Sequence, residues 1–162
     1  MNKAGAIIIA AAAAAASVSA AKAQLAPNMS SGPIDITGDR LQVEDEVATW
    51  TGNVRAVQGE TILTAKKLIA DLDGGGSFSR IRAIGDVRYS SGKEAITGKK
   101  GVYDAATRTI TISDNVVVTQ GEQVMTGGEL IYWIDTGKIL FTAEKGRRIR
   151  GIFYAKDADK QS

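Results

Sequence analysis

A repeat of about thirty residues is the sequence feature that most constrains what this chain can fold into. One element begins with an apolar residue, a threonine and a small residue, and it occurs at Ile36–Leu41, Leu63–Leu68, Ile96–Gly101 and Met125–Leu130. The other combines Gly, Asn or Asp with a valine, and it occurs at Gly52–Val54, Gly85–Val87 and Asp114–Val116. Both elements recur at spacings of 33 and then 29 residues, at Thr64, Thr97 and Thr126 in the first and at Val54, Val87 and Val116 in the second. Such a period indicates stacked supersecondary units that share one core.

Short alternating runs of apolar and polar residues fill the space between these elements. Examples are Ile34–Thr37, Thr109–Ser113 and Leu130–Ile134, and alternation of this kind places successive side chains on opposite faces of a strand. Gly, Asp and Asn interrupt the runs at intervals of roughly 8–12 residues, as in all-β proteins. We therefore predict repeated short antiparallel strands, three or four per unit. The Gly/Asn/Asp elements are interpreted as turns that enter the next strand.

The N-terminal segment is predicted to be a cleavable signal peptide over residues 1–23. Lys3 precedes an uncharged, alanine-dominated run of 17 residues, and Ala21-Lys22-Ala23 supplies a small-x-small cleavage site before Gln24. A retained membrane anchor is the alternative, although a spanning helix needs roughly 20 strongly apolar residues. The remaining chain divides into a polar lead-in at 24–33, one β domain at 34–155 and a short polar tail at 156–162.

Charge argues against nucleic-acid binding. Cleavage removes Lys3 and Lys22 from the 20 basic residues, which leaves 18 basic against 18 acidic residues. The distribution is uneven, because residues 34–73 are mainly acidic and the segment from Thr136 onward is mainly basic. Opposite charge at the two ends suits a module that assembles head to tail.

The absence of histidine and cysteine excludes the usual catalytic and redox equipment. We predict no catalytic residue, no metal site and no cofactor. Glu44-Asp45-Glu46 lacks the spacing of a calcium loop and is interpreted as a hairpin turn. Gly74-Gly75-Gly76 is interpreted as a flexible loop, Trp50 and Trp133 as packing residues rather than sugar platforms, and Arg148–Ile152 as an amphipathic edge strand.

An apolar stripe faces the interior of the predicted sheet. Its default interpretation is a hydrophobic core, but only nine of the 162 residues are aromatic, and the many small side chains leave open a ligand-holding interior. The stripe consists of Ile34, Ile36, Val54, Leu63, Leu68, Val87, Tyr89, Ile110, Ile112, Val116, Val118, Leu130, Tyr132 and Phe141.

The order of the motifs resembles the OstA-like family, and within it the LptA-like proteins of the periplasm. The resemblance covers roughly residues 32–145 and rests on short motifs in a specific order: Gly32–Asp39, Thr49–Val54, Val57–Gly59, Ala65–Leu68, Tyr103-Asp104, Asp114–Val116 and Asp135–Ile139. Asp114 stands where the family usually has glycine, the Asp73–Ser79 loop is glycine-rich and the tail is short.

The resemblance implies an all-β fold, a slightly open twisted β-jelly roll whose interior carries the acyl chains of lipopolysaccharide. It places the lipid-facing isoleucine pair of the first strand at Ile34 and Ile36, and it implies a periplasmic, non-catalytic carrier. Such proteins join head to tail with their own copies, with an LptC-like inner-membrane partner and with an LptD-like outer-membrane partner.

Two other functions stay open at this point. An LptC-like subunit of the same pathway would retain residues 4–20 as a membrane helix. An unrelated exported, non-catalytic β module would bind sugar or protein, with a filled core and surface tryptophans. A glycosidase ranks last, because no carboxylate pair lies in a recognisable cleft-forming context.

Overall fold

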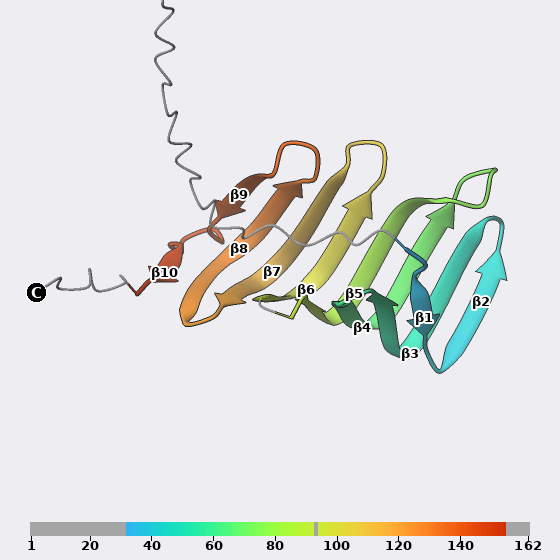
Figure 1. Cartoon of the computed structure of the whole chain (residues 1–162), viewed down its shortest axis with the longest axis horizontal. Coiled ribbons are helices and arrows are strands. Elements are labelled where there is room, and N and C mark those ends of the chain that lie inside the picture. Colours follow the sequence, from blue (N-terminus) through green and yellow to red (C-terminus); the bar gives the residue numbers. More distant parts are fainter. Residues whose placement is uncertain (1–31, 93, 155–162) are drawn as a thin grey trace, which may run out of the picture.

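Ten β-strands form one antiparallel sheet in the computed structural model, which describes residues 32–92 and 94–154 (Figure 1). The strands are β1 (Asp35–Thr37), β2 (Arg40–Glu44), β3 (Val47–Gln58), β4 (Thr61–Leu72), β5 (Phe78–Ser90), β6 (Glu94–Asp104), β7 (Thr109–Gln120), β8 (Gln123–Trp133), β9 (Lys138–Thr142) and β10 (Arg150–Ile152). The described residues contain no helix. The all-β, open jelly-roll fold class is thus confirmed.

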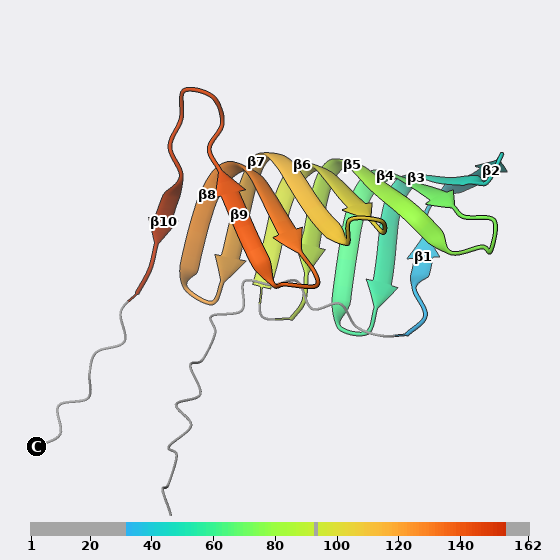
Figure 2. The same ribbon diagram turned by 90° about the horizontal axis from the view of Figure 1, so that it is seen from above.

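The central strands β3 to β8 follow their order in the sequence, and each pairs with the next. At one end β1 and β2 share the outer edge of β3, and at the other β9 and β10 share the outer edge of β8. Viewed from above, the strands succeed one another along the long axis of the molecule (Figure 2). Since most pairings join neighbours in the chain, the sequence period becomes a spatial period.

A line of β-bulges crosses the sheet at mid-strand. The pairing register shifts between Thr51 and Val54 in β3, between Ile84 and Val87 in β5, and between Ser113 and Val116 in β7. The inserted pairs have positive φ at both residues, and they are Gly52-Asn53, Gly85-Asp86 and Asp114-Asn115. Gly, Asn and Asp tolerate this conformation best, and bulges bend the strands that carry them.

These bulges correct the predicted strand count. The Gly/Asn/Asp elements are not turns between short strands, because each lies inside one strand of 12 or 13 residues. Each repeat is a hairpin of two long strands. The alternation on either side of a bulge suggests two short strands because the inserted pair breaks the period.

The two repeated elements face each other across each hairpin. Val54 pairs with Ala65, Val87 with Gly98 and Val116 with Gly127. All three valines are almost fully buried. The repeat therefore encodes the same arrangement three times: a buried valine after a bulge pairs with a small residue on the neighbouring strand.

The turns at the sheet ends are those that the sequence indicates. Asp45 and Glu46 form the β2–β3 hairpin turn with φ of 47° and 62°. The glycine-rich β4–β5 loop is held by Asp73, whose Oδ1 accepts hydrogen bonds from the backbone N–H groups of Gly75 at 2.9 Å and Ser77 at 2.8 Å.

The predicted signal peptide, most of the lead-in and the polar tail lie outside the described residues. Within residues 32–92 and 94–154, no helix is long and apolar enough to cross a membrane. The same residues contain no cluster of three side chains that could hold a metal ion.

Candidate functional site

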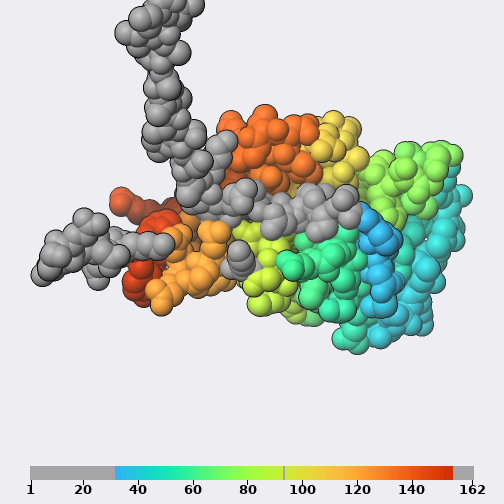
Figure 3. Space-filling model, in the orientation of Figure 1, coloured from blue at the N-terminus to red at the C-terminus, as the bar shows by residue number. Residues whose placement is uncertain are grey.

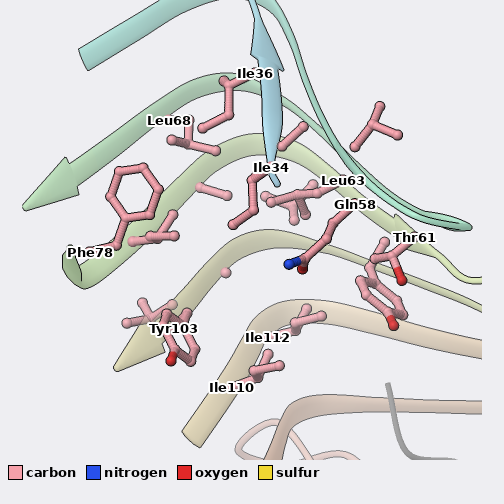
Figure 4. Close-up of a pocket in the computed structure, with 18 residues that line it drawn as sticks. Ile34, Ile36, Gln58, Thr61, Leu63, Leu68, Phe78, Tyr103, Ile110 and Ile112 are labelled. Atoms are coloured by element: carbon pink, nitrogen blue, oxygen red, sulfur yellow. The ribbon is translucent and has the colours of Figure 1, made fainter. Parts of the chain in front are cut away.

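An apolar cavity of about 380 Å³ lies inside the bent sheet, between the β1 segment and β7 (Figure 4). Gln58 and Thr61 lie at one end of it, and Phe78 and Tyr103 at the other. The residues that line it are Ile34, Ile36, Ala56, Val57, Gln58, Thr61, Leu63, Leu68, Phe78, Ile81, Ala83, Val87, Tyr89, Gly101, Val102, Tyr103, Ile110 and Ile112. None of these described lining residues carries a charge.

The space exists because the inward side chains are small in the middle of the sheet. One row of paired residues crosses the interior from Trp50 through Leu68, Ala83, Gly101, Ile112 and Leu130 to Phe141. Side-chain size falls to a methyl group and then to a hydrogen atom at Ala83 and Gly101. A sheet that curves over such residues leaves a gap that its own side chains do not fill.

The first strand and the residues before it form one wall. Ile36 packs against the cluster around Val54 and Leu68, whereas Ile34 is 40% exposed and borders the cavity. The side chain of Gln58 donates a hydrogen bond from Nε2 to the carbonyl oxygen of Gly32 at 2.9 Å. This bond fixes the entry to β1, which lies against β3 on the molecular surface (Figure 3).

Charged side chains form pairs outside this interior. Lys66 Nζ lies 2.8 Å from Asp86 Oδ2, and Lys100 Nζ lies 3.4 Å from Asp114 Oδ2, so a lysine of the neighbouring strand pairs with a bulge aspartate in β5 and in β7. The hydrogen bond to Asp86 raises the pKa of Lys66, and Lys66 in turn lowers the pKa of Asp86. Both pairs are solvent-exposed and contribute little stability.

One carboxyl group is buried at the hairpin end where β6 begins. Glu94 is among the buried residues, and the hydroxyl of Ser91 donates a hydrogen bond to its Oε1 at 2.9 Å. Burial raises the pKa of Glu94, because desolvation disfavours the ionised form, and the Ser91 hydrogen bond opposes part of that effect.

The structure places the fourteen predicted interior residues in two groups. Ile34, Ile36, Leu63, Leu68, Val87, Tyr89, Ile110 and Ile112 line the cavity. Val54 packs in the cluster below β1, and Val116, Val118, Leu130, Tyr132 and Phe141 pack together in the C-terminal part of the interior. That C-terminal group follows the default interpretation of the stripe, a hydrophobic core.

Sequence reasoning does not identify several of the residues that line the cavity. Phe78, Ile81, Ala83 and Tyr103 belong to the same alternating face, and the parity of β5 and β6 identifies them once the bulges are known. Gly101 carries no apolar signal, and Gln58 and Thr61 are polar. Alternation identifies the residues on the inner face, but it does not tell which of them line the cavity and which pack against other side chains.

The edges of the sheet are apolar and differ in charge. Leu41 and Val43 of β2 are 54% and 62% exposed at one end, and Leu140, Ile149, Ile152, Phe153 and Tyr154 are exposed at the other. These edges lie at opposite ends of the molecule (Figure 1). Asp35, Asp39 and Glu44 accompany the first edge, and Lys138, Arg148 and Arg150 accompany the second.

Comparison with known families and proteins agrees with this architecture. The family described as LptA/(LptD N-terminal domain) LPS transport protein matches residues 35–138. An uncharacterised protein of Rhizobium meliloti (strain 1021) is 32% identical over 160 residues, which cover 88% of this chain and 86% of that protein.

A solved structure has the same fold. The chain is similar to LptH of Pseudomonas aeruginosa, described as the LptA-homologous periplasmic component of the lipopolysaccharide transport device, with a TM-score of 0.65. The sequences are 19% identical, and the match covers 76% of this chain and 96% of LptH.

Proposed function

Since the chain belongs to the LptA/LptD N-terminal domain family of lipopolysaccharide transport proteins, we propose that it is a periplasmic carrier of lipopolysaccharide. Its cavity holds lipid acyl chains, and its two sheet edges join it to an LptC-like inner-membrane partner, an LptD-like outer-membrane partner and further copies of itself. It acts by binding and passing lipid, without catalysing a reaction.

The apolar cavity is the observation that carries this proposal. Its lining offers apolar side chains with a few polar groups at its ends, and it includes no charged residue among those described. Each methylene moved from water into such a site contributes about 0.8 kcal/mol. An acyl chain that places several methylenes there gains enough free energy to be held, while the polar head of the lipid remains in water.

The edges support the assembly part of the proposal. Within the described residues, β1 and β2 pair with β3 alone and β9 and β10 with β8 alone, so each of these strands has an unpaired side. Unpaired strand edges are templates for addition of another strand. A contact between the first edge of one copy and the last edge of another does not close, so it extends into open chains.

The alternatives receive less support. Trp50 is partly buried and packs against the cluster of Val54 and Leu68, and the ring of Trp133 lies under the ammonium group of Lys138 at 4.9 Å, so neither forms a free sugar platform. An LptC-like anchored subunit differs only in the retention of residues 4–20, which lie outside the described residues. Sequencing the N-terminus of the periplasmic protein separates the two, because the carrier is expected to begin at or near Gln24.

Filling the cavity tests the binding proposal. We expect Ala83→Leu to weaken binding of purified lipopolysaccharide at least about tenfold, because the added carbons occupy space that acyl chains need. Ala95→Leu is the matched control, since the same change is made on the other face of the neighbouring strand β6. Deacylated lipopolysaccharide is the control ligand and should bind neither protein.

Two results would contradict binding in the cavity. One is equal affinity of wild type and Ala83→Leu for intact lipopolysaccharide, measured by titration calorimetry. The other is binding of deacylated lipopolysaccharide as tightly as the intact form, which would show recognition of sugar instead of acyl chains.

Sedimentation velocity tests the assembly proposal. We expect oligomers that grow with protein concentration and weaken with salt, because charge steers the pairing of the edges. Removing residues 149–162 should give a folded monomer that still binds lipid. A wild-type protein that is monomeric at every concentration and ionic strength would refute self-assembly through these edges.

A further inference from the structure

The cavity ends abruptly at β7, although the apolar interior continues beyond it. Ile110 and Ile112 of β7 line it, and among the described residues none of β8, β9 or β10 does. Directly across from them, Leu130 pairs with Ile112 and Tyr132 with Ile110. Leu130 is 1% exposed, and both residues belong to the packed C-terminal cluster.

Ile112 belongs to both regions. It lines the cavity, and it is also a buried member of the cluster with Leu130 and Val118. On one side of it lies the empty space over Gly101, its pairing partner, and on the other lies the filled space at Leu130. Ile112 therefore lies at the border between the open part and the packed part of one continuous apolar interior.

The Ile112 side chain packs closely against the backbone of a glycine. A methyl group placed on Gly98 would lie 2.6 Å from Cγ2 of Ile112 and 3.0 Å from the carbonyl oxygen of Ser113. Carbon atoms in contact normally lie about 3.5–4.0 Å apart, so Ile112 occupies the place that any larger residue at position 98 would need. The Ile112 side chain packs against the backbone of Gly98, where a side chain would otherwise lie.

We infer that Ile112, seated on Gly98, is the end stop of the ligand cavity and sets the length of acyl chain that the interior accepts. The inference rests on the proposed function and adds a residue that determines specificity. A chain that enters along Ile34 and Leu63 extends over Ala83 and Gly101 until it meets the Ile112 side chain. Methylenes beyond that point stay in water.

The test uses saturated fatty acids from dodecanoic to octadecanoic acid, each below its micelle concentration, in competition with fluorescent N-phenyl-1-naphthylamine. In the wild type, affinity should rise about fourfold for each added methylene that is buried, and then stop rising at one chain length. That length is the measurement, and because it comes from ratios of affinities, it does not depend on the fraction of protein that is folded.

Two substitutions should move the limit in opposite directions. Ile112→Ala removes about three carbons from the stop and should shift the limit to longer chains, with a gain on the order of tenfold or more for the longest acid relative to dodecanoic acid. Gly98→Ala pushes the isoleucine toward the cavity and should shift the limit to shorter chains.

Val118→Ala is the matched control, because it truncates another buried residue of β7 in the same cluster that does not line the cavity. Its length limit should equal that of the wild type. The inference is overturned if Ile112→Ala keeps the wild-type limit, or if Val118→Ala shifts the limit as far as Ile112→Ala does.

Failure of the proposed function gives a different result. In that case no fatty acid displaces the fluorescent probe from the wild-type protein, and the end-stop inference fails together with the carrier function. A wild type that binds and shows a length limit, together with an Ile112→Ala protein that keeps that limit, rejects the end stop alone.

Discussion

The interior over β4 to β6 and the interior over β7 to β9 are built on the same bulged hairpins and are filled differently. Over Ala83 and Gly101 the inward positions are small, and a cavity remains. Over Leu130, Tyr132 and Phe141 they are large, and the side chains pack on one another. The backbone repeat is thus independent of the interior volume, so one half can specialise in binding while the other supplies stability.

The division has a thermodynamic consequence. Residues of the filled half exchange water for protein contacts on folding, and each contributes its full burial free energy. Residues of the cavity wall exchange part of their hydration only when a ligand arrives. Substitutions of equal chemistry in the two halves are therefore expected to differ in effect.

Introducing a charge gives the largest contrast. Val118→Asp places a carboxylate at a position that is 2% exposed, and an unpaired charge there costs several kcal/mol, so the protein should fail to fold. Ile36→Asp places the same group at the cavity wall, where solvent reaches it. That variant should remain folded by circular dichroism but lose lipopolysaccharide binding. Unfolding of both variants would refute the contrast.

Truncating leucine gives the next contrast. Leu130→Ala should lower the free energy of unfolding by about 2–5 kcal/mol, because it leaves a cavity in a packed cluster. Leu63→Ala, at the wall of an existing cavity, should cost about 1–2 kcal/mol less than Leu130→Ala, since less packing is lost. Urea denaturation of the ligand-free proteins measures both, and equal losses would show that the two halves are packed alike.

Adding one methyl group to the interior glycines sharpens the comparison. Gly98→Ala should destabilise by about 1–3 kcal/mol because it crowds Ile112. A methyl group at Gly101 would lie 3.4 Å from Cγ1 of Val87 and 3.7 Å from Cβ of Ala83, which is ordinary contact. Gly101→Ala should therefore be neutral or gain about 0.5–1 kcal/mol, because glycine inside a strand is unfavourable. Thermal denaturation distinguishes the two.

The smallest expected effect is a pH dependence at Glu94. Burial raises the pKa of this carboxyl in the folded protein, so the folded state binds its proton more tightly than the unfolded state does. Stability from this group is present below the ordinary carboxyl pKa and is lost as pH rises through the raised value. Glu94→Gln should remove that component, and an unchanged pH profile of the melting temperature would contradict it.

Much of the fold follows from local sequence signals. Alternation in segments such as Thr109–Ser113 identifies strands, and the recurrence of Thr64, Thr97 and Thr126 identifies the repeat. Both signals act between neighbours in the chain, and in this sheet neighbours in the chain are neighbours in space. The family resemblance read from the motif order is confirmed by the match to residues 35–138.

The bulges show where sequence reasoning stops. Gly85 and Asp86 belong to the residue types that tolerate positive φ best, so the sequence indicates a local change of direction there. Whether that change ends a strand or bends it depends on the pairing of the flanking residue Ile84 with Lys67 on one side and Lys100 on the other. A hairpin turn and a mid-strand bulge use the same residue types, and only the partner strands distinguish them.

Within each uninterrupted run of alternation, the sequence alone determined which side chains share a face of the strand, because parity along a strand is a property of the backbone. The tertiary structure decided which of them border empty space. Ile110 and Leu130 have the same alternating surroundings and both contact the C-terminal cluster, yet only Ile110 also lines the cavity. A cavity is a difference between the space that a curved sheet encloses and the volume of all the side chains that share it, and no single position carries that information.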